Sequence, residues 1–230
     1  MTPVALAVDD LRDQYLREMA LVRQTYERTG DGTAAIRRRS AVVDRILIEM
    51  WRRAFAGQAA PNVSLLALGG YGRKDLFPFS DIDVLFAYAD DKAEEQSREA
   101  VRTIIQGMWD IGLRASPASR TVKEASRFDP DNLEFTLATL DRRFLAGQFP
   151  LYQQLHQTVL PGLVLSDWTT ITQKLNEVAR ARHSKFGNTI FHLEPNLKDC
   201  PGGLRDYSLA VWFALLFHLK DTKEWPRQRG

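Results

Sequence analysis

The stretch VSLLALGGYGRKDLFPFSDIDVLFAY, residues 63–88, contains two short apolar segments separated by a glycine-rich connection. Apolar runs of this length, bounded by turn-forming residues, are typical of buried strands. We therefore predict strands at residues 63–68 and 81–88. The second of these opens with two acids, Asp81 and Asp83, which interrupt an otherwise apolar pattern.

The two acids are candidate metal ligands. Alternate side chains of a strand project to one face, so Asp81 and Asp83 point the same way while Ile82 and Val84 point into the core. Two neighbouring carboxylates repel each other unless a proton or a cation lies between them. Hard oxygen ligands suit Mg²⁺, which also binds substrate phosphates. The pair therefore predicts a Mg²⁺ site. We expect Asp81 and Asp83 each to bind the metal and each to be a catalytic residue.

The residues before this strand are candidate phosphate contacts. Gly69 and Gly70 have no side chain to obstruct a triphosphate, and their backbone can turn N–H groups toward it. Arg73 adds a cation, and Ser80 offers a hydroxyl beside the acids. A Gly-Gly pair alone is most often a tight turn, and an Asp-x-Asp alone is commonly a capped loop or a solvated pair. Their succession between two strands is much more specific for nucleotide chemistry.

The rest of the chain is predicted to be mostly helical. Apolar spacing predicts helices at residues 8–29, 33–55, 92–111, 131–146, 149–160, 166–186 and 204–220, with a third strand at 113–122. The expected fold class is α/β (α+β), with a small mixed β-sheet core, a helical N-terminal lead and a mostly helical C-terminal half. The expected divisions are 1–60, 61–147 and 148–230, the last being a helical region with a PGGLRD loop.

Composition excludes several classes of protein. No run of about 18 apolar residues is present, and the first residues lack the pattern of a secretory signal, so we expect no membrane partner and a cytoplasmic location. The single cysteine, Cys200, cannot form an internal disulfide. The formal net charge is +2, which argues against a dedicated nucleic-acid-binding protein.

Two motifs carry a resemblance to a known family. The Gly-Gly turn followed by an Asp-x-Asp strand resembles the signature of the DNA polymerase β-type nucleotidyltransferase superfamily. Within it, GGYGRKDLFPFSDIDVLF, residues 69–86, is similar to the N-terminal nucleotidyltransferase domain of the bacterial PII-protein uridylyltransferase/uridylyl-removing enzymes. FHLEPNLKDCPGGLRD, residues 191–206, resembles a second signature of that family. The resemblance extends over roughly residues 35–220.

The resemblance implies an activity and its partners. Asp81 and Asp83 would hold Mg²⁺ on a nucleoside triphosphate, and the Gly69-Gly70 turn would bind the phosphates. An acceptor hydroxyl would attack the α-phosphorus and release pyrophosphate. In the family, the nucleotide is UTP and the acceptor is a tyrosine of a PII-type signalling protein.

The second motif lies in a loop rich in glycine and proline ahead of the last predicted helix. Asn196, Lys198 and Arg205 are polar groups beside this apolar helix, and we take them as further candidate nucleotide-binding residues. The alternative is a connecting turn in which Arg205 and Asp206 form a local ion pair.

This sequence departs from the family in two respects. The superfamily places a third carboxylate on the strand after the intervening helix, but residues 113–119 contain no acid, and Ser116-Pro117 replaces the usual Gly-His. Asp110, Glu134 and Asp141 are possible substitutes between which the sequence does not choose. None of the four histidines is followed by Asp, so we expect no uridylyl-removing phosphohydrolase activity in these residues.

Three functions therefore stay open. The first is a Mg²⁺-dependent uridylyltransferase acting on a PII-type protein. The second is a catalytically reduced nucleotide-binding regulatory module, favoured by the missing strand carboxylate. The third is a nucleotidyltransferase acting on a small molecule or on an RNA end, and the near-neutral charge weakens the RNA version.

Overall fold

The chain folds as two compact units. The computed structural model describes residues 8–55, 61–194 and 196–225. The first unit comprises the residues up to Ala125 together with Ala138–Leu155, and the second comprises Ser126–Leu137 together with the residues from His156 onward. The sequence-predicted boundary at residue 60 lies outside the described residues.

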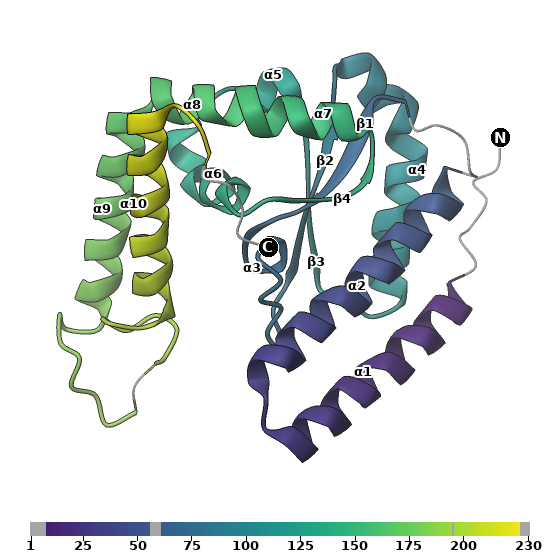
Figure 1. Ribbon diagram of the computed structural model, residues 1–230, viewed down its shortest axis with the longest axis horizontal. Helices are drawn as coiled ribbons and strands as arrows, with labels where there is room; N and C mark the ends of the chain where they lie inside the picture. The colour runs from purple at the N-terminus through teal and green to yellow at the C-terminus, as the bar shows by residue number, and fades with distance from the viewer. Residues whose placement is uncertain (1–7, 56–60, 195, 226–230) are drawn as a thin grey trace. The chain divides into compact units, whose positions relative to one another are not determined.

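The first unit is a four-stranded mixed sheet with helices (Figure 1). Its strands are β1 (Val63–Ala67), β2 (Ile82–Tyr88), β3 (Ala115–Thr121) and β4 (Arg143–Gly147). Its helices are α1 (Asp9–Thr29), α2 (Gly32–Ala54), α3 (Gly69–Gly72), α4 (Asp91–Asp110), α5 (Val122–Ala125) and α7 (Phe149–Gln154). The strand order is β3-β2-β1-β4, with β1 antiparallel to both of its neighbours and β3 parallel to β2. The predicted α/β (α+β) fold class with a small mixed sheet is confirmed.

Both faces of the sheet are covered, which explains the continuous apolar runs of its central strands. Leu65 of β1 and Phe86 of β2 oppose each other and are fully buried in the core, to which α2 and α4 contribute. Leu66 and Leu85, the next opposed pair of the two strands, point to the other face, where α7 packs on β1, β2 and β4. Because β1 and β2 are buried on both faces, their polar residues lie near the ends of the strands.

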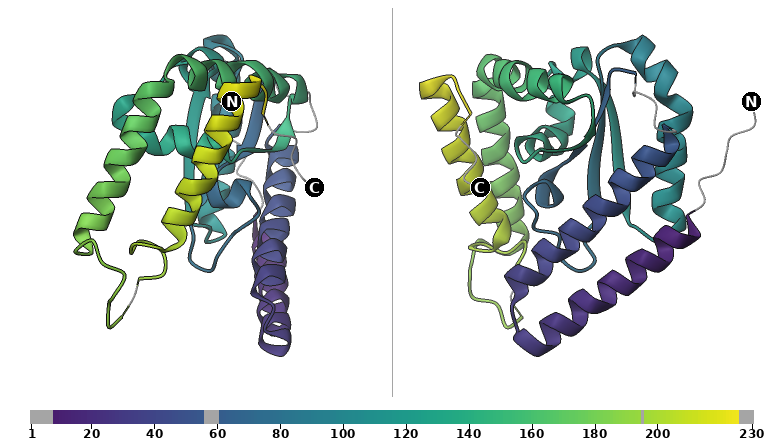
Figure 2. Two further views of the ribbon diagram at one scale, coloured as in Figure 1. Left: turned by 60° about the vertical axis from the view of Figure 1, so that its left-hand side comes forward. Right: turned by 45° about the vertical axis from the view of Figure 1, so that its right-hand side comes forward.

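The helices α1 and α2 form a hairpin and lie side by side in Figure 1 and in the right-hand view of Figure 2. Gly30 adopts a left-handed conformation (φ 68°) and ends α1, and the side chain of Asp31 caps α2 by accepting a hydrogen bond from Ala34 N at 2.9 Å. The apolar faces of the two helices, including Leu11 and Ile46, are buried. The hairpin thus joins the sheet core through α2.

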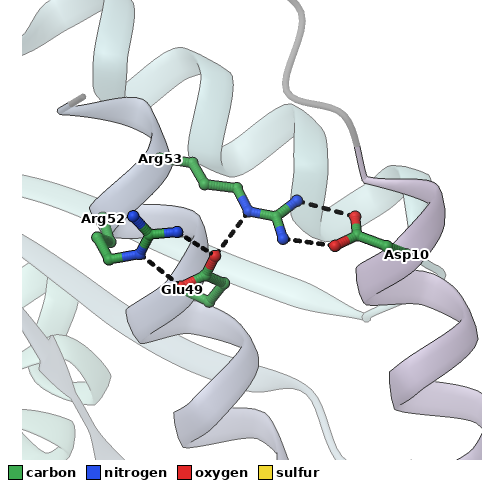
Figure 3. Close-up of polar contacts among 4 residues, drawn as sticks. All are labelled: Asp10, Glu49, Arg52 and Arg53. Atoms are coloured by element: carbon green, nitrogen blue, oxygen red, sulfur yellow. Dashed lines mark hydrogen bonds and ion pairs between the residues drawn. The ribbon is translucent and has the colours of Figure 1, made fainter. Parts of the chain in front are cut away.

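An arginine fork links the two helices of the hairpin (Figure 3). The guanidinium of Arg53 donates to both carboxylate oxygens of Asp10 and, through Nε, to Glu49 at 2.8 Å. Arg52 donates to the same Glu49 carboxylate at 2.7 and 2.8 Å. These hydrogen bonds lower the pKa of Asp10 and of Glu49 to about 2.

The prediction of a helix at residues 131–146 is wrong for the second half of this range. The helix α6 (Leu133–Leu140) ends early, and Arg143–Gly147 form β4, which pairs with β1. A short apolar run does not reveal by spacing alone whether it is helix or strand, so pairing with a neighbour decides. Gly147 permits this pairing because it has φ 97°, and a Cβ there would lie 2.3 Å from the carbonyl oxygen of Val63.

The strand β3 lies at an edge of the described sheet and contains Pro117 opposite Val84. Ile82 N donates to the carbonyl of Arg114 at 2.7 Å. In a parallel pair this directs the N–H of Ser116 toward β2 and leaves position 117 facing outward. The proline therefore costs the sheet no hydrogen bond.

The second unit is helical. Its elements are η1 (Pro130–Asn132), η2 (Leu155–Val159), α8 (Leu160–Ser166), α9 (Trp168–Lys185) and α10 (Leu204–Thr222), and α6 and η2 cross the boundary between the units. The helices α9 and α10 lie side by side (Figures 1 and 2), and both contact α8. Among the described residues, none of the helices has the length and apolar character needed to cross a lipid bilayer.

Candidate active site

The two sequence-predicted halves of the site meet at one end of the sheet. Since β1 and β2 are antiparallel, the end of β1 at Ala67 lies beside the start of β2 at Ile82. Leu68 N donates to the carbonyl of Asp83 at 2.9 Å and extends the ladder by one residue. The glycines that follow Leu68 are thereby placed next to the acids.

The glycine segment forms a single helical turn, α3. Gly72 N donates to the carbonyl of Leu68 at 2.8 Å, and Arg73 N donates to that of Gly69 at 3.0 Å. Gly69 opens the turn with φ 53°, a conformation that residues with a Cβ rarely adopt. The first N–H groups of a helical turn, here those of Gly69 and Gly70, have no acceptor within the turn itself.

The carboxylate of Asp83 faces the first glycine of this turn. A Cβ on Gly69 would lie 3.4 Å from Asp83 Oδ2. Asp83 is partly buried within β2, and Asp81 directly precedes the strand and is exposed. Ile82 and Val84 are buried in the core between and after them, as predicted. The N-terminal end of the turn, at Gly69, thus lies next to the acidic start of β2.

This pair of carboxylates fits Mg²⁺. Among the described residues, no group of three or more His, Cys, Asp or Glu side chains could hold a metal ion. Mg²⁺ commonly takes only one or two protein carboxylates and completes its octahedron with waters and substrate phosphates. The small, partly exposed donor set of Asp81 and Asp83 beside Gly69 has this character.

The strand beside β2 brings a hydroxyl to the position next to Asp83. In the parallel register, Asp83 lies opposite Ser116 of β3. The carbonyl of Arg114, which precedes β3, accepts a hydrogen bond from Ile82 N, and Arg114 is therefore the neighbour of Asp81. The structure confirms that β3 itself brings no acid to this end of the sheet.

The three acids considered as substitutes lie in different places. Asp110 ends α4 and accepts a hydrogen bond from Gln106 at 2.8 Å. Glu134 belongs to the second unit. Asp141 lies next to α3, where its backbone carbonyl would be 1.7 Å from a Cβ on Gly72. Of the three, Asp141 is the acid that directly contacts the glycine turn.

Arg73 and Ser80 flank the same segment. The guanidinium of Arg73 forms ion pairs with Asp75, at 3.3 Å, and with Asp141, and its side chain is 32% exposed. One of its nitrogens would lie 4.0 Å from a Cβ on Gly70. Ser80 is exposed and immediately precedes Asp81. The first unit thus brings together Gly69, Gly70, Arg73, Ser80, Asp81 and Asp83 within one segment of the fold.

A polar cluster behind the turn was not predicted. Tyr71 Oη donates to Asp44 Oδ1 at 2.6 Å, and the guanidinium of Arg143 pairs with the same carboxylate at 2.8 and 3.0 Å. Burial of Tyr71, together with the charge of Asp44, raises the pKa of its hydroxyl well above the usual range. The hydroxyl of Tyr71 therefore keeps its proton and donates it in the hydrogen bond to Asp44. No sequence signal connects these positions, which lie far apart in the chain.

The remaining sequence-predicted residues lie in the second unit, Asn196 and Lys198 between α9 and α10 and Arg205 in the first turn of α10. Asn196 Oδ1 accepts hydrogen bonds from Lys198 N at 3.0 Å and from Asp199 N at 2.9 Å, so its side chain holds a turn. Lys198 is exposed, and its carbonyl accepts from Arg205 N at 2.9 Å. Pro195 of the same motif lies outside the described residues.

The ion pairs of this loop differ from the alternative considered from the sequence. Arg205 pairs with Asp199 at 3.6 Å, whereas Asp206 pairs with Arg182 and with His183 Nε2 at 2.9 Å. Burial alone would raise the pKa of Asp206, but the hydrogen bonds from His183 and Gly202 and the charge of Arg182 lower it on balance. Asp206 therefore anchors the loop to α9 and does not pair with its neighbour.

Several known enzymes are similar to most of this chain. The bifunctional uridylyltransferase/uridylyl-removing enzyme of Pasteurella multocida is 33% identical over 180 residues, which cover 78% of this chain and 20% of that enzyme. The enzyme of the same name from Stutzerimonas stutzeri is 38% identical over 178 residues, 76% of this chain and 19% of the relative. That of Photobacterium profundum is 29% identical over 210 residues, 91% of this chain and 24% of the relative.

A family model described as GlnD PII-uridylyltransferase matches residues 170–230. The chain is similar to PII-uridylyltransferases. The family match covers α9, the loop after it and α10, whereas the match to the Photobacterium protein, over 91% of the chain, necessarily includes the Gly69–Asp83 segment. The chain spans about a fifth of the length of the curated PII-uridylyltransferase relatives it matches.

Proposed function

We propose that this chain transfers a uridylyl group from UTP to a tyrosine of a PII-type protein in a Mg²⁺-dependent reaction. The observation that carries the proposal is the position of the Asp83 carboxylate over Gly69, with Asp81 directly before the strand. The match to the PII-uridylyltransferase family model supports the PII protein, and the names of the relatives support the uridylyl group. Bound Mg²⁺ would neutralise phosphate charge.

The reaction requires one bond to form and one to break. The tyrosine oxygen attacks the α-phosphorus of UTP and loses its proton, and the bond from the α-phosphorus to the oxygen leading to the β-phosphate breaks. Pyrophosphate leaves with the electron pair of that bond. Asp81 and Asp83 would hold the metal, while the N–H groups of Gly69 and Gly70 and the hydroxyl of Ser80 would contact the phosphates.

Arg73 and the second unit have supporting roles in this proposal. Arg73 is held close to Gly70 and would add a positive charge to the phosphates. Asn196, Lys198 and Arg205 are proposed as further nucleotide contacts, because they lie in the loop and the first turn of α10, which the family model also matches.

One observation favours a second candidate, a nucleotide-binding module with reduced turnover. The strand β3, the strand on which the superfamily places a third carboxylate, contains no acid and brings Ser116 opposite Asp83. A neutral hydroxyl cannot accept a proton from the attacking oxygen as a carboxylate can. This candidate predicts Mg²⁺-dependent nucleotide binding without transfer. A small-molecule acceptor remains the third candidate and predicts transfer that does not need a PII protein.

The test is transfer of label from α-labelled UTP, with ATP in parallel, to a PII-type protein in the presence of Mg²⁺. Asp81→Asn and Asp83→Asn should each lower the transfer rate by at least ~100-fold, because loss of even an outer-shell group costs a metal site ~10–100-fold. Asp91→Asn is the matched control. Asp91 is an exposed carboxylate just beyond the other end of β2.

The outcomes separate the three candidates. Label on the PII protein that requires both acids and survives Asp91→Asn supports the proposal. Nucleotide binding without any transfer supports the reduced module. Label that appears on a small molecule in the absence of a PII protein supports the third candidate.

A further inference from the structure

Side chains of α2, of β4 and of the turn itself form a hydrogen-bonded cluster at the C-terminal end of the glycine turn. Asp44 of α2 accepts the hydroxyl of Tyr71 at 2.6 Å and both terminal nitrogens of Arg143, from β4, at 2.8 and 3.0 Å. Arg143 also lies over the ring of Tyr71, 5.4 Å from its centroid. Tyr71 belongs to α3 itself, so the cluster ties the turn to a helix and to a strand.

Arg143 additionally binds the backbone of the turn. Its Nε donates to the carbonyl of Gly72 at 3.2 Å, and its Nη2 donates to the carbonyl of Tyr71 at 3.3 Å. These carbonyls lie at the end of the turn, where that of Tyr71 also accepts a hydrogen bond from Lys74 N at 3.1 Å. A guanidinium carries five donors in one rigid plane, so it can cap two carbonyls and pair with a carboxylate at once. A lysine ammonium cannot reproduce this geometry.

The turn needs such support because it is too short to be stable alone. Isolated helices of fewer than about 12 residues are marginal in water, and α3 has four residues, three of them glycine. Gly72 also packs against the backbone of Asp141 so closely that no Cβ fits. The conformation of α3 is therefore imposed by contacts at its C-terminal end, while Gly69 at its other end faces Asp83.

The three supporting side chains are withdrawn from solvent. Tyr71 is 1% exposed, and the side chains of Asp44 and Arg143 are each 19% exposed. Arg143 is committed to the turn and to Asp44, and Tyr71 to Asp44. Their position suits support of the turn and does not suit contact with a ligand.

We propose that Arg143 and Asp44, which pair with each other and both contact Tyr71, are positioning residues that fix the Gly69–Gly72 turn in the conformation that receives the triphosphate of the nucleotide. This inference rests on the proposed function, and it adds residues that neither motif contains. Loosening the cluster lets the turn sample other conformations, so nucleotide binding weakens before the chemical step does.

The test compares two arginines of the full chain. Arg143→Lys should raise the KM for UTP about tenfold, the loss expected for a hydrogen bond to a charged group, while kcat changes less than about threefold. Arg53→Lys is the matched control, because Arg53 also forks onto a carboxylate, at 25% exposure, but links α1 to α2 (Figure 3). It should lower the thermal midpoint and leave the KM for UTP unchanged. Tyr71→Phe, which removes one hydroxyl, should raise the KM in the same direction by a smaller factor.

Each result decides the inference. A KM unchanged in Arg143→Lys, or raised equally by Arg143→Lys and Arg53→Lys at equal loss of thermal midpoint, overturns it while the proposed function stands. If Arg143→Lys does not fold, the KM of Tyr71→Phe decides by the same criterion. A wild-type chain that neither binds nor transfers UTP overturns the proposed function first, and the inference with it.

Discussion

At the scale of single residues, the two ends of α3 impose different demands on glycine. Gly69 is needed for its left-handed backbone and leaves room for the Asp83 carboxylate. Gly72 is needed because the backbone of Asp141 occupies the space of a side chain. The first demand concerns the approach of the Asp83 carboxylate, whereas the second concerns the packing of α3 on Asp141.

Gly72→Ala should therefore destabilise the protein. Its Cβ would lie 1.7 Å from the carbonyl oxygen of Asp141, which is backbone and cannot rotate away. Overpacking of this kind costs about 3 kcal/mol or more of unfolding free energy. Urea denaturation measures the loss, with Gly162→Ala as control, because a Cβ on Gly162 meets no atom within 4 Å. Equal stability of the two variants would show that the turn can move away from Asp141.

Asp141→Asn tests the pairing of Arg73. If Arg73 binds phosphate, the ion pair with Asp141 competes with the nucleotide, so removing the charge of Asp141 should lower the KM for UTP by about two- to threefold. If Asp141 instead serves as the missing third acid, the same variant should lose turnover. Steady-state kinetics with varied UTP distinguish the two results, which have opposite consequences for catalytic efficiency.

At the scale of elements, the α1–α2 hairpin carries a pH-dependent link. The pKa values of Asp10 and Glu49 fall from 3.8 and 4.5 to about 2 on folding. A lowered folded-state pKa stabilises the protein above the unfolded pKa, and this stabilisation is lost as the pH falls through the folded value. The relevant window runs from about pH 5 down to about pH 2.

Arg53→Gln should remove the part of this dependence that comes from Asp10 and weaken the part from Glu49, to which Arg52 still donates. The urea midpoint of the wild type should exceed that of the variant above about pH 5, and the difference should shrink toward pH 2. Arg23→Gln is the control, since Arg23 pairs with Glu27 at 80% and 57% exposure, and an exposed pair contributes little. A wild-type advantage that persists unchanged at pH 2 would contradict the assignment of this link to the two acids.

Most elements of the first unit could be predicted from the sequence, and one could not. The strands β1 and β2 were predicted because their apolar runs are flanked by Gly-Gly and by acids, which limit the possible interpretations. β4 was missed because Arg143–Gly147 continues the apolar spacing of α6, and its strand conformation comes from pairing with β1. Local pattern does not contain such long-range information.

The same limit applies to the candidate site. Asp81, Asp83, Gly69 and Gly70 lie in one continuous segment, so their proximity follows from a single strand-turn-strand motif. The contacts of Asp44 and Arg143 with Tyr71 depend on the packing of α2 and β4 against α3 and could not be derived from spacing. The roles of all these residues in catalysis stay predictions until the variants are measured.

At the scale of the whole molecule, the chain spans about a fifth of relatives that carry two activities in their names, uridylyl transfer and uridylyl removal. We expect the 230-residue chain to catalyse transfer without removal, because none of its four histidines is followed by aspartate. Incubation of a uridylylated PII-type protein with the chain and divalent metal should release no UMP. Release of UMP at a rate that scales with chain concentration would contradict this expectation.

The placement of Pro117 has a consequence for how the molecule behaves at high concentration. An edge strand offers its outward N–H and C=O groups to any other strand, which is how sheets of separate molecules join and precipitate. In β3, the outward position at 117 has no N–H, so the row of donors is broken near its centre. A residue that looks unfavourable for a strand thus discourages strand addition by a neighbouring copy while leaving the inner ladder, and the acids at its end, undisturbed.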